Sequence, residues 1–187
     1  RKMQEAGNNT FLLQNKDVFL DMLTDSGVNA MSDLQFAAMM KADDAYAGCE
    51  TFNRVVDAVD ELFGCRNVLP THQGRACENI LAEAFCGPGK VALMNFHFTT
   101  AKAHITRVGG TVEELVDAKG LIPQTDDPFK GNFNLENLAS RIDEIGKDNV
   151  AFVRVESGTN LIGGQPVSLE NMLAVTDICH EKGVKSV

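Results

Sequence analysis

Apolar residues recur at helical spacing in several stretches of the chain, and residues that start or stop helices bound these stretches. Ser32 and Gln35 have the spacing of a capping box, which opens the first stretch. Gly64 directly follows the second, as expected of a helix terminator. The first predicted helix begins at residue 32. Five further helices are predicted over residues 50–63, 74–85, 99–108, 135–145 and 169–182.

Short apolar runs lie between most of these helices and predict strands. The runs cover residues 68–69, 90–94, 111–116, 150–155 and 183–187, whereas residues 117–132 lack periodicity and are predicted to form a loop. Strands that alternate with helices favour an α/β fold with a mostly parallel sheet wrapped by helices. In such folds ligands bind at the carboxyl ends of the strands.

The chain divides into two parts by this pattern. Residues 1–64 carry helices and turns, so we expect an N-terminal helical arm, and residues 65–187 carry the α/β domain. The last apolar run stops inside what should be a buried parallel strand. We therefore expect the α/β domain to be incomplete and the chain to be a fragment of a longer protein.

Composition narrows the class of protein. The chain is 44% hydrophobic and 23% charged, which is typical of a folded globular protein. Its formal charge of -9 argues against a nucleic-acid partner, because phosphate backbones are bound by basic surfaces. No apolar run predicts a membrane span or a signal peptide, so we expect no membrane partner and a cytoplasmic location.

Cysteine and histidine spacing argues against a metal or disulfide framework. The five cysteines form no CxxC pair, so we expect them to be reduced and mostly buried. The four histidines lack the spacing of zinc ligands.

The segment of residues 68–75 is a candidate anion site. An apolar run breaks at Pro70, and Gly74 follows where a helix begins. A helix N-terminus offers unpaired backbone N–H groups and the positive end of the helix dipole, so a phosphate can bind there. Gln73 and Arg75 would add donors. An ordinary strand-to-helix turn with a solvated Arg75 fits the same local pattern.

This segment is one of several motifs that stand together in the order of a known family. They are Thr-Asp-Ser-Gly at 24–27, Asp-Asp-Ala-Tyr-Ala-Gly at 43–48, His-Gln-Gly-Arg at 72–75, Asn-Phe-His-Phe-Thr-Thr at 95–100 and Asn-Leu-Ile-Gly-Gly-Gln-Pro-Val-Ser at 160–168. From about Asn9 onward the chain resembles the β-eliminating lyases, the tyrosine phenol-lyase and tryptophanase family of pyridoxal-phosphate enzymes. The resemblance implies the large domain of the aspartate aminotransferase-like fold.

The resemblance assigns the cofactor contacts. It implies that Gln73, Gly74 and Arg75 bind the phosphate of pyridoxal 5'-phosphate and that Phe98 stacks on its ring. Asn160 resembles the asparagine that bonds the phenolic oxygen of the cofactor and reaches the substrate carboxylate. Taken without the family, Phe98 would be a core aromatic and Asn160 a loop residue.

The resemblance also implies a catalytic acid and an oligomer. Tyr46, the only tyrosine, corresponds to a general acid that reaches the active site of a neighbouring subunit, so we expect a homo-oligomer built as a dimer of dimers. A phenol can donate a proton at neutral pH when its surroundings lower its pKa.

The same resemblance implies contacts to the substrate and to a metal ion. Thr24, Ser26 and Thr99 resemble residues near the substrate. Gly27 and Asp44 correspond to ligands of a potassium ion, although the family has glutamate where this chain has Asp44. A Thr-Asp-Ser-Gly turn is also an ordinary capped loop.

The implied reaction is cleavage of the Cβ–Cγ bond of tyrosine or tryptophan, giving pyruvate, ammonia and phenol or indole. The lysine that holds the cofactor covalently and the acid beside its ring nitrogen belong to family segments beyond Val187. We therefore expect the chain alone to be inactive. The alternatives are a non-catalytic fragment or pseudoenzyme that serves as an assembly module, and another lyase or aldolase of the same fold.

Overall fold

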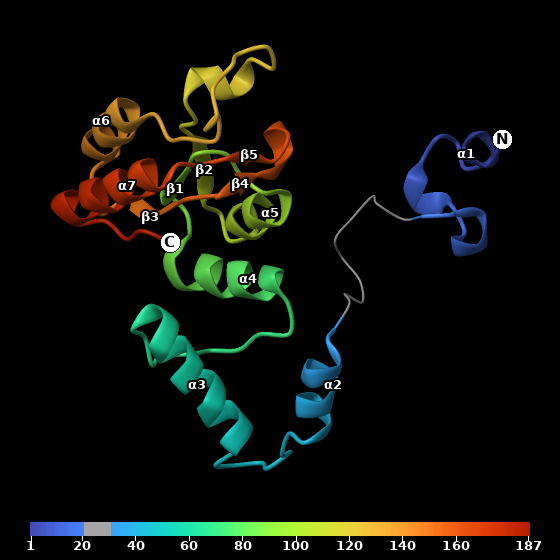
Figure 1. Ribbon diagram of the computed structural model, residues 1–187. Helices are drawn as coiled ribbons and strands as arrows, with labels where there is room; N and C mark the ends of the chain where they lie inside the picture. Colours follow the sequence, from blue (N-terminus) through green and yellow to red (C-terminus); the bar gives the residue numbers. More distant parts are fainter. Residues whose placement is uncertain (21–30) are drawn as a thin grey trace. The chain divides into compact units, whose positions relative to one another are not determined.

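The computed structural model describes residues 1–20 and 31–187, which form two compact units, Arg1–Leu69 and Pro70–Val187. Figure 1 labels the α-helices and strands of both units. The described residues of the first unit form helical elements: α1 (Lys2–Glu5), the 3-10 turns η1 (Thr10–Leu12) and η2 (Asn15–Asp17), α2 (Asp33–Met40) and α3 (Glu50–Phe63).

The predicted helix signals of the first unit are confirmed. The Ser32 hydroxyl accepts from the Gln35 backbone N–H at 3.1 Å, and the Gln35 side chain accepts from the Ser32 N–H at 3.1 Å, which completes the capping box of α2. Helix α3 ends at Gly64, whose φ of 66° is left-handed and suits glycine. Thus local capping chemistry fixes the ends of these helices.

The second unit alternates helices with short strands. Its main elements are α4 (Gly74–Phe85), β1 (Val91–Met94), α5 (Thr99–Arg107), β2 (Thr111–Glu114), η3 (Ala118–Leu121), α6 (Leu135–Ile145), β3 (Val150–Arg154) and α7 (Leu169–Lys182). Strands β2, β1 and β3 pair in that order and in parallel, which confirms the predicted α/β class. A short antiparallel hairpin of β4 (Gly158–Thr159) and β5 (Gln165–Pro166), joined by η4 (Asn160–Ile162), follows β3.

The last residues extend the sheet on the outer side of β3. Val153 donates its backbone N–H to the Lys185 carbonyl at 2.7 Å, and Val187 donates to the Val153 carbonyl at 2.8 Å. Ser186 forms a parallel bridge with Val153. The predicted strand at residues 183–187 is therefore present as a single bridge. Within the described ranges, no helix is long and apolar enough to cross a membrane.

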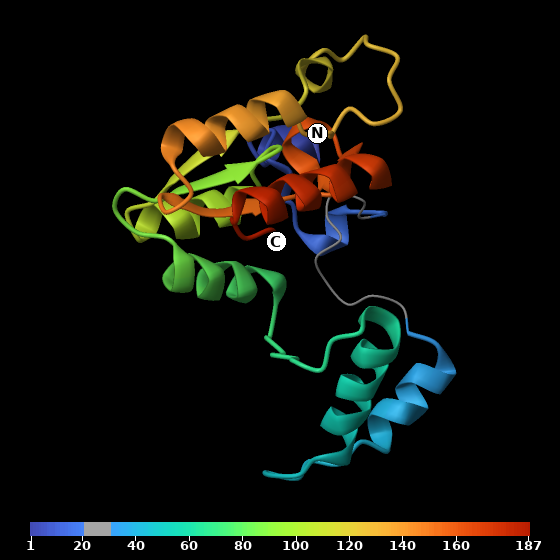
Figure 2. The same ribbon diagram turned by 90° about the vertical axis from the view of Figure 1, so that its left-hand side faces the viewer.

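Helices cover both faces of this sheet, α4 and α5 on one and α6 and α7 on the other (Figures 1 and 2). The core on the α4–α5 side contains Ala82, Ala92, Met94, Ala101, Ile105, Ala151 and Phe152. The core on the α6–α7 side contains Leu93, Phe133, Leu138, Ile142, Val150, Val153, Val175 and Cys179. Two buried faces explain why the strands read as continuous apolar runs.

An irregularity in β3 decides which residues reach each core. Val91 pairs with Val150 but Ala92 pairs with Phe152, so Ala151 is an extra residue in β3. Both Ala151 and Phe152 consequently contribute to the α4–α5 core. Such a bulge redirects side chains near the end of a strand.

Two predicted strands are corrected. Residues 68–69 form no strand, and Leu69 is exposed directly before Pro70, which has no N–H to donate to a ladder. The strand predicted over residues 111–116 ends at Glu114, because Val116 instead forms an antiparallel bridge with Phe133. That bridge closes the base of the long loop.

Gly131, at the end of that loop, packs against the β4–β5 hairpin without room for a side chain. A Cβ at this position would lie 2.6 Å from the Gln165 carbonyl oxygen and 2.9 Å from that of Pro166. We expect Gly131→Ala to reduce the free energy of unfolding of the complete protein by about 1–3 kcal/mol through overpacking, measured by chemical denaturation. Gly158→Ala is the matched control, because a Cβ at Gly158 meets no atom within 4 Å. Equal unfolding midpoints for the two variants would contradict the assigned packing.

Candidate functional site

The carboxyl edge of the sheet is held together by one buried amide, that of Asn95. Its Nδ2 donates to the Gly131 carbonyl at 2.8 Å and to the Glu156 carbonyl at 2.9 Å. Its Oδ1 accepts from the Glu156 N–H at 2.8 Å. Asn95 directly follows β1 and Glu156 follows β3, so this side chain fixes where both strand ends release their loops.

The N-terminus of α4 is open to an anion. Gln73 is the N-cap residue in an extended conformation, and no side chain caps this end in the part of the chain that the structure describes. Gly74 and Arg75 are exposed, and a Cβ at Gly74 would meet no atom within 4 Å. The Thr71 hydroxyl donates to the Gln73 carbonyl at 3.1 Å and steadies the turn. This end of the helix fits a phosphate group.

The N-terminus of α5 carries the next candidates. Phe98 is the N-cap residue and is half-buried, whereas Thr99 is exposed. Helices α4 and α5 pack against each other in the same unit. The start of α4 and Phe98 therefore belong to the same compact unit, Pro70–Val187.

Asn160 lies at the start of η4 with its side chain exposed. Its backbone is fixed, because the Gly163 N–H donates to the Asn160 carbonyl at 3.1 Å and the preceding Thr159 is fully buried. The Thr159 hydroxyl donates to the Gln165 carbonyl at 2.9 Å, across the β4–β5 hairpin. This hairpin was not predicted, because two-residue strands leave no periodicity.

The remaining predicted site residues lie elsewhere. Tyr46 and Asp44 belong to the first unit, in the exposed loop between α2 and α3, and the Tyr46 side chain is fully exposed. Thr24, Ser26 and Gly27 lie outside the described residues.

Asp43 organises the loop that carries Tyr46, a role that the sequence did not reveal. Its carboxylate accepts from the backbone N–H groups of Glu50 and Thr51, each at 2.9 Å, and from the Thr51 hydroxyl. These hydrogen bonds, the one from the Thr51 hydroxyl first, hold the pKa of Asp43 well below its usual range. Asp43 thus caps α3 from outside the usual N-cap position, which Cys49 occupies.

A group of charged and polar side chains connects α4, α5 and β3. Glu78 on α4 pairs with Arg154 of β3 at 2.9 Å and accepts a hydrogen bond from Thr100 on α5. Arg154 also pairs with Glu156 at 3.2 Å. Burial, with a contribution from Glu78, raises the pKa of Glu156, and Arg154 opposes that shift.

The cysteines correct one prediction. All five are free, but only Cys179 is buried; Cys65, which follows α3, and Cys77, in the first turn of α4, are exposed. Burial raises the pKa of the Cys179 thiol to about 11, which leaves it unreactive at neutral pH. Among the described residues, no group of three or more His, Cys, Asp or Glu side chains could hold a metal ion.

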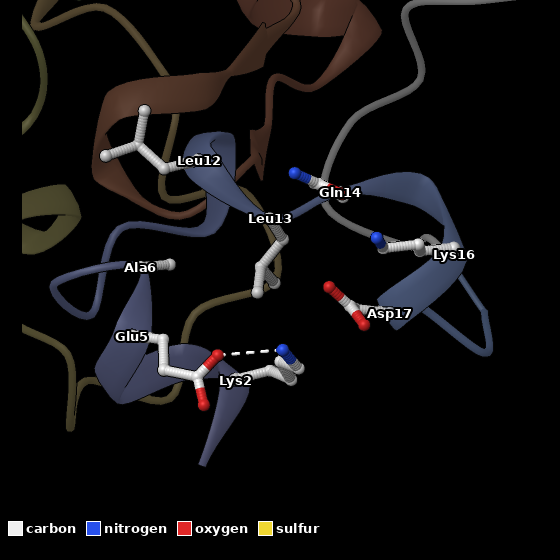
Figure 3. Close-up of a pocket in the computed structure, with 8 residues that line it drawn as sticks. All are labelled: Lys2, Glu5, Ala6, Leu12, Leu13, Gln14, Lys16 and Asp17. Atoms are coloured by element: carbon white, nitrogen blue, oxygen red, sulfur yellow. Dashed lines mark hydrogen bonds and ion pairs between the residues drawn. The ribbon is translucent and has the colours of Figure 1, made fainter.

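A separate hollow lies within the N-terminal arm (Figure 3). Its volume is about 220 Å³, and it is lined by Lys2, Glu5, Ala6, Leu12, Leu13, Gln14, Lys16 and Asp17. Lys2 and Glu5 pair at 2.7 Å on its rim. None of the predicted site residues that the structure describes lines it.

Solved structures share the fold of the chain. Cystalysin from Treponema denticola, which contains a pyridoxal 5'-phosphate cofactor, matches with a TM-score of 0.56 and 13% identity over 81% of this chain and 37% of its own. A PLP-bound C-S lyase from Staphylococcus hominis matches with a TM-score of 0.54 and 13% identity, over 82% of this chain and 38% of its own. At such identity the likeness establishes the fold, that of fold-type I pyridoxal-phosphate enzymes.

Sequence relatives then identify the family. The beta-eliminating lyase family model matches residues 21–187. The tyrosine phenol-lyase of Fusobacterium nucleatum is 43% identical over 183 residues, and that of Pasteurella multocida is 44% identical over 183 residues. The chain belongs to the β-eliminating lyase family. The match covers 98% of this chain but 40% of the length of each of these relatives.

The Asp43 cap generates a prediction about the Tyr46 loop. Replacing Asp43 with Asn in the complete protein should speed amide hydrogen exchange at Glu50 and Thr51, because their charged acceptor is lost. Since the folded-state pKa is lowered, the native cap should persist below pH of about 4 and disappear as the pH falls through that lowered value.

The control for this experiment is Asp33→Asn, which removes a carboxylate bonded to the Leu34 amide in α2. It should leave exchange at the start of α3 unchanged. The assigned cap is rejected if Asp43→Asn protects these amides as well as the native side chain does.

Proposed function

We propose that the complete protein is a pyridoxal-phosphate-dependent lyase that cleaves the Cβ–Cγ bond of tyrosine. With one water consumed, the products are phenol, pyruvate and ammonia. The main support for this proposal is the exposed, uncapped start of α4 at Gly74, beside α5, in a chain of the β-eliminating lyase family. The names of the relatives favour tyrosine over tryptophan as the substrate.

The cofactor is assigned to residues of the second unit. The backbone N–H groups at the start of α4 and the Arg75 guanidinium would bind the phosphate, with Gln73 as a further donor. Phe98 would stack on the ring, and the Asn160 amide would donate to its phenolic oxygen. When bound, pyridoxal phosphate supplies an electron sink for the negative charge that develops on the substrate.

The chain supplies a proton donor from its other unit. Tyr46 would protonate the ring carbon of the leaving group, which turns phenol into a neutral leaving group. Its full exposure, and exposed apolar side chains on α2 and α3 such as Phe36 and Phe63, support a homo-oligomer in which Tyr46 serves a neighbouring subunit.

The proposal also includes contacts to the substrate and to a potassium ion. Thr24, Ser26 and Thr99 would contact the substrate, and Asp44 with the Gly27 carbonyl would bind a potassium ion. The covalent lysine and the acid beside the ring nitrogen are assigned to family segments outside this chain. The activity is therefore proposed for the complete protein, which we place in the cytoplasm.

Cofactor affinity tests the phosphate site. The complete protein should bind pyridoxal phosphate with absorbance in the violet, and Arg75→Ala should raise the dissociation constant at least about tenfold through loss of a charge-assisted hydrogen bond. Arg107→Ala is the matched control. Arg107 lies in the last turn of α5, where it pairs with Glu83. The proposal is rejected if the native complete protein, supplied with pyridoxal phosphate, shows no absorbance from bound cofactor.

Tyr46→Phe tests the acid. It should slow phenol and pyruvate release by about 10²–10⁴-fold, the usual contribution of a general acid, while the dissociation constant of the cofactor stays unchanged. Native turnover by this variant would reject the role.

Mixed subunits test where Tyr46 acts. If it serves a neighbouring site, co-assembled Tyr46→Phe and Arg75→Ala chains should regain part of the native activity, because one site then combines an intact Arg75 with an intact Tyr46. If Tyr46 acts within its own chain, every mixed site carries a defect and activity stays low.

A further inference from the structure

Four side chains form one connected polar group that the proposed chemistry does not use. Arg154 donates through Nη1 to Glu78 Oε1 at 2.9 Å, and through Nη2 it pairs with Glu156 Oε2 at 3.2 Å. The second oxygen of Glu78 accepts from the Thr100 hydroxyl. We call Glu78, Thr100, Arg154 and Glu156 the Glu78 network.

Glu78, Thr100 and Glu156 each lie within four residues of a candidate cofactor contact. Glu78 is four residues after Gly74, so the two share a face of α4. Thr100 lies in the first turn of α5, two residues after Phe98. Glu156 lies four residues before Asn160 and is held by Asn95. One group connected by two hydrogen bonds and an ion pair thus joins the three segments.

The group is shielded from solvent. The side chains of Glu78, Arg154 and Glu156 are 10%, 21% and 20% exposed. Loss of Arg154 would leave two partly buried carboxylates without their cation. The planar guanidinium also holds both carboxylates in fixed directions, which a flexible lysine would not do.

Stability alone is a poor explanation for charges at this place. Glu78 and Arg154 also line a small cavity whose other lining side chains are apolar, namely Leu81, Met94, Ala101, Ile105 and Phe152. A well-packed apolar set often stabilises a protein as much as a buried ion pair does. What the ion pair adds is direction, because hydrogen bonds fix the angles between the elements that they join.

We propose that Glu78, Thr100 and Arg154 are positioning residues that set the phosphate-binding start of α4 at a fixed distance and angle from the Phe98 end of α5. They act through these helix ends. The inference rests on the proposed function, because it concerns the same cofactor.

The first test uses Glu78→Gln in the complete protein, with Glu83→Gln as the matched control. Glu83 is on the same helix and also pairs with α5, through Arg107, but at the far ends of both helices. Glu78→Gln should raise the dissociation constant of pyridoxal phosphate at least about tenfold, which corresponds to about 1.4 kcal/mol. It should also change the visible circular dichroism of the saturated protein. Glu83→Gln should change neither quantity.

A second pair of variants covers the case in which Glu78→Gln fails to fold. Thr100→Val keeps the shape of the side chain but removes the hydroxyl that donates to Glu78, whereas Thr100→Ser keeps the hydroxyl. The valine variant should weaken cofactor binding several-fold and alter the circular dichroism of the bound cofactor. The serine variant should restore both to native values.

The outcomes separate the two proposals. A native protein that binds no pyridoxal phosphate rejects the proposed function, and this inference falls with it. If the native protein binds the cofactor and Glu78→Gln and Thr100→Val match it in affinity and circular dichroism, only the positioning role is overturned. A lower melting temperature without those changes also overturns it, since the network would then be structural alone.

Discussion

The amide of Asn95 is the interaction on which the carboxyl edge of the sheet depends. Strand ends leave backbone N–H and C=O groups without ladder partners, and burying them unpaired costs about 1–3 kcal/mol each. Asn95 satisfies groups of Glu156 and Gly131 at once, from a fully buried position. Because its Oδ1 and Nδ2 both bond the backbone of Glu156 and its Nδ2 also bonds that of Gly131, one residue links the loop after β3 to the loop that ends before α6.

The rest of the candidate site follows from that edge. A parallel sheet brings the ends of β1 and β3 together, so α5 and the β4–β5 hairpin begin near each other. The cores on both faces hold the helices, and the Glu78 network adds direction where apolar packing alone allows sliding. The start of α4 remains uncapped and exposed, which leaves its dipole for a ligand.

The sequence was sufficient for features with local causes. Capping at Ser32, the stop at Gly64 and the apolar spacing of α3, α4, α6 and α7 come from neighbouring residues, and the structure has these helices as predicted. Features that depend on distant partners were missed. Glu78 and Arg154 are 76 residues apart, so no spacing rule connects them. The strand predicted at residues 68–69 was wrong because a strand also needs a distant partner. An apolar pair without a hydrogen-bonded neighbouring strand is not a strand.

The two units divide the proposed chemistry between them. The residues proposed to bind the cofactor belong to Pro70–Val187. Tyr46 belongs to Arg1–Leu69, where Asp43 fastens the loop that carries it to the start of α3. Within each unit the local anchors are strong: a charged cap for the Tyr46 loop, and a buried amide with an ion pair for the cofactor edge. Neither anchor spans both units. The exposed apolar side chains of α2 and α3 are the residues that would supply an assembly surface for the proposed oligomer.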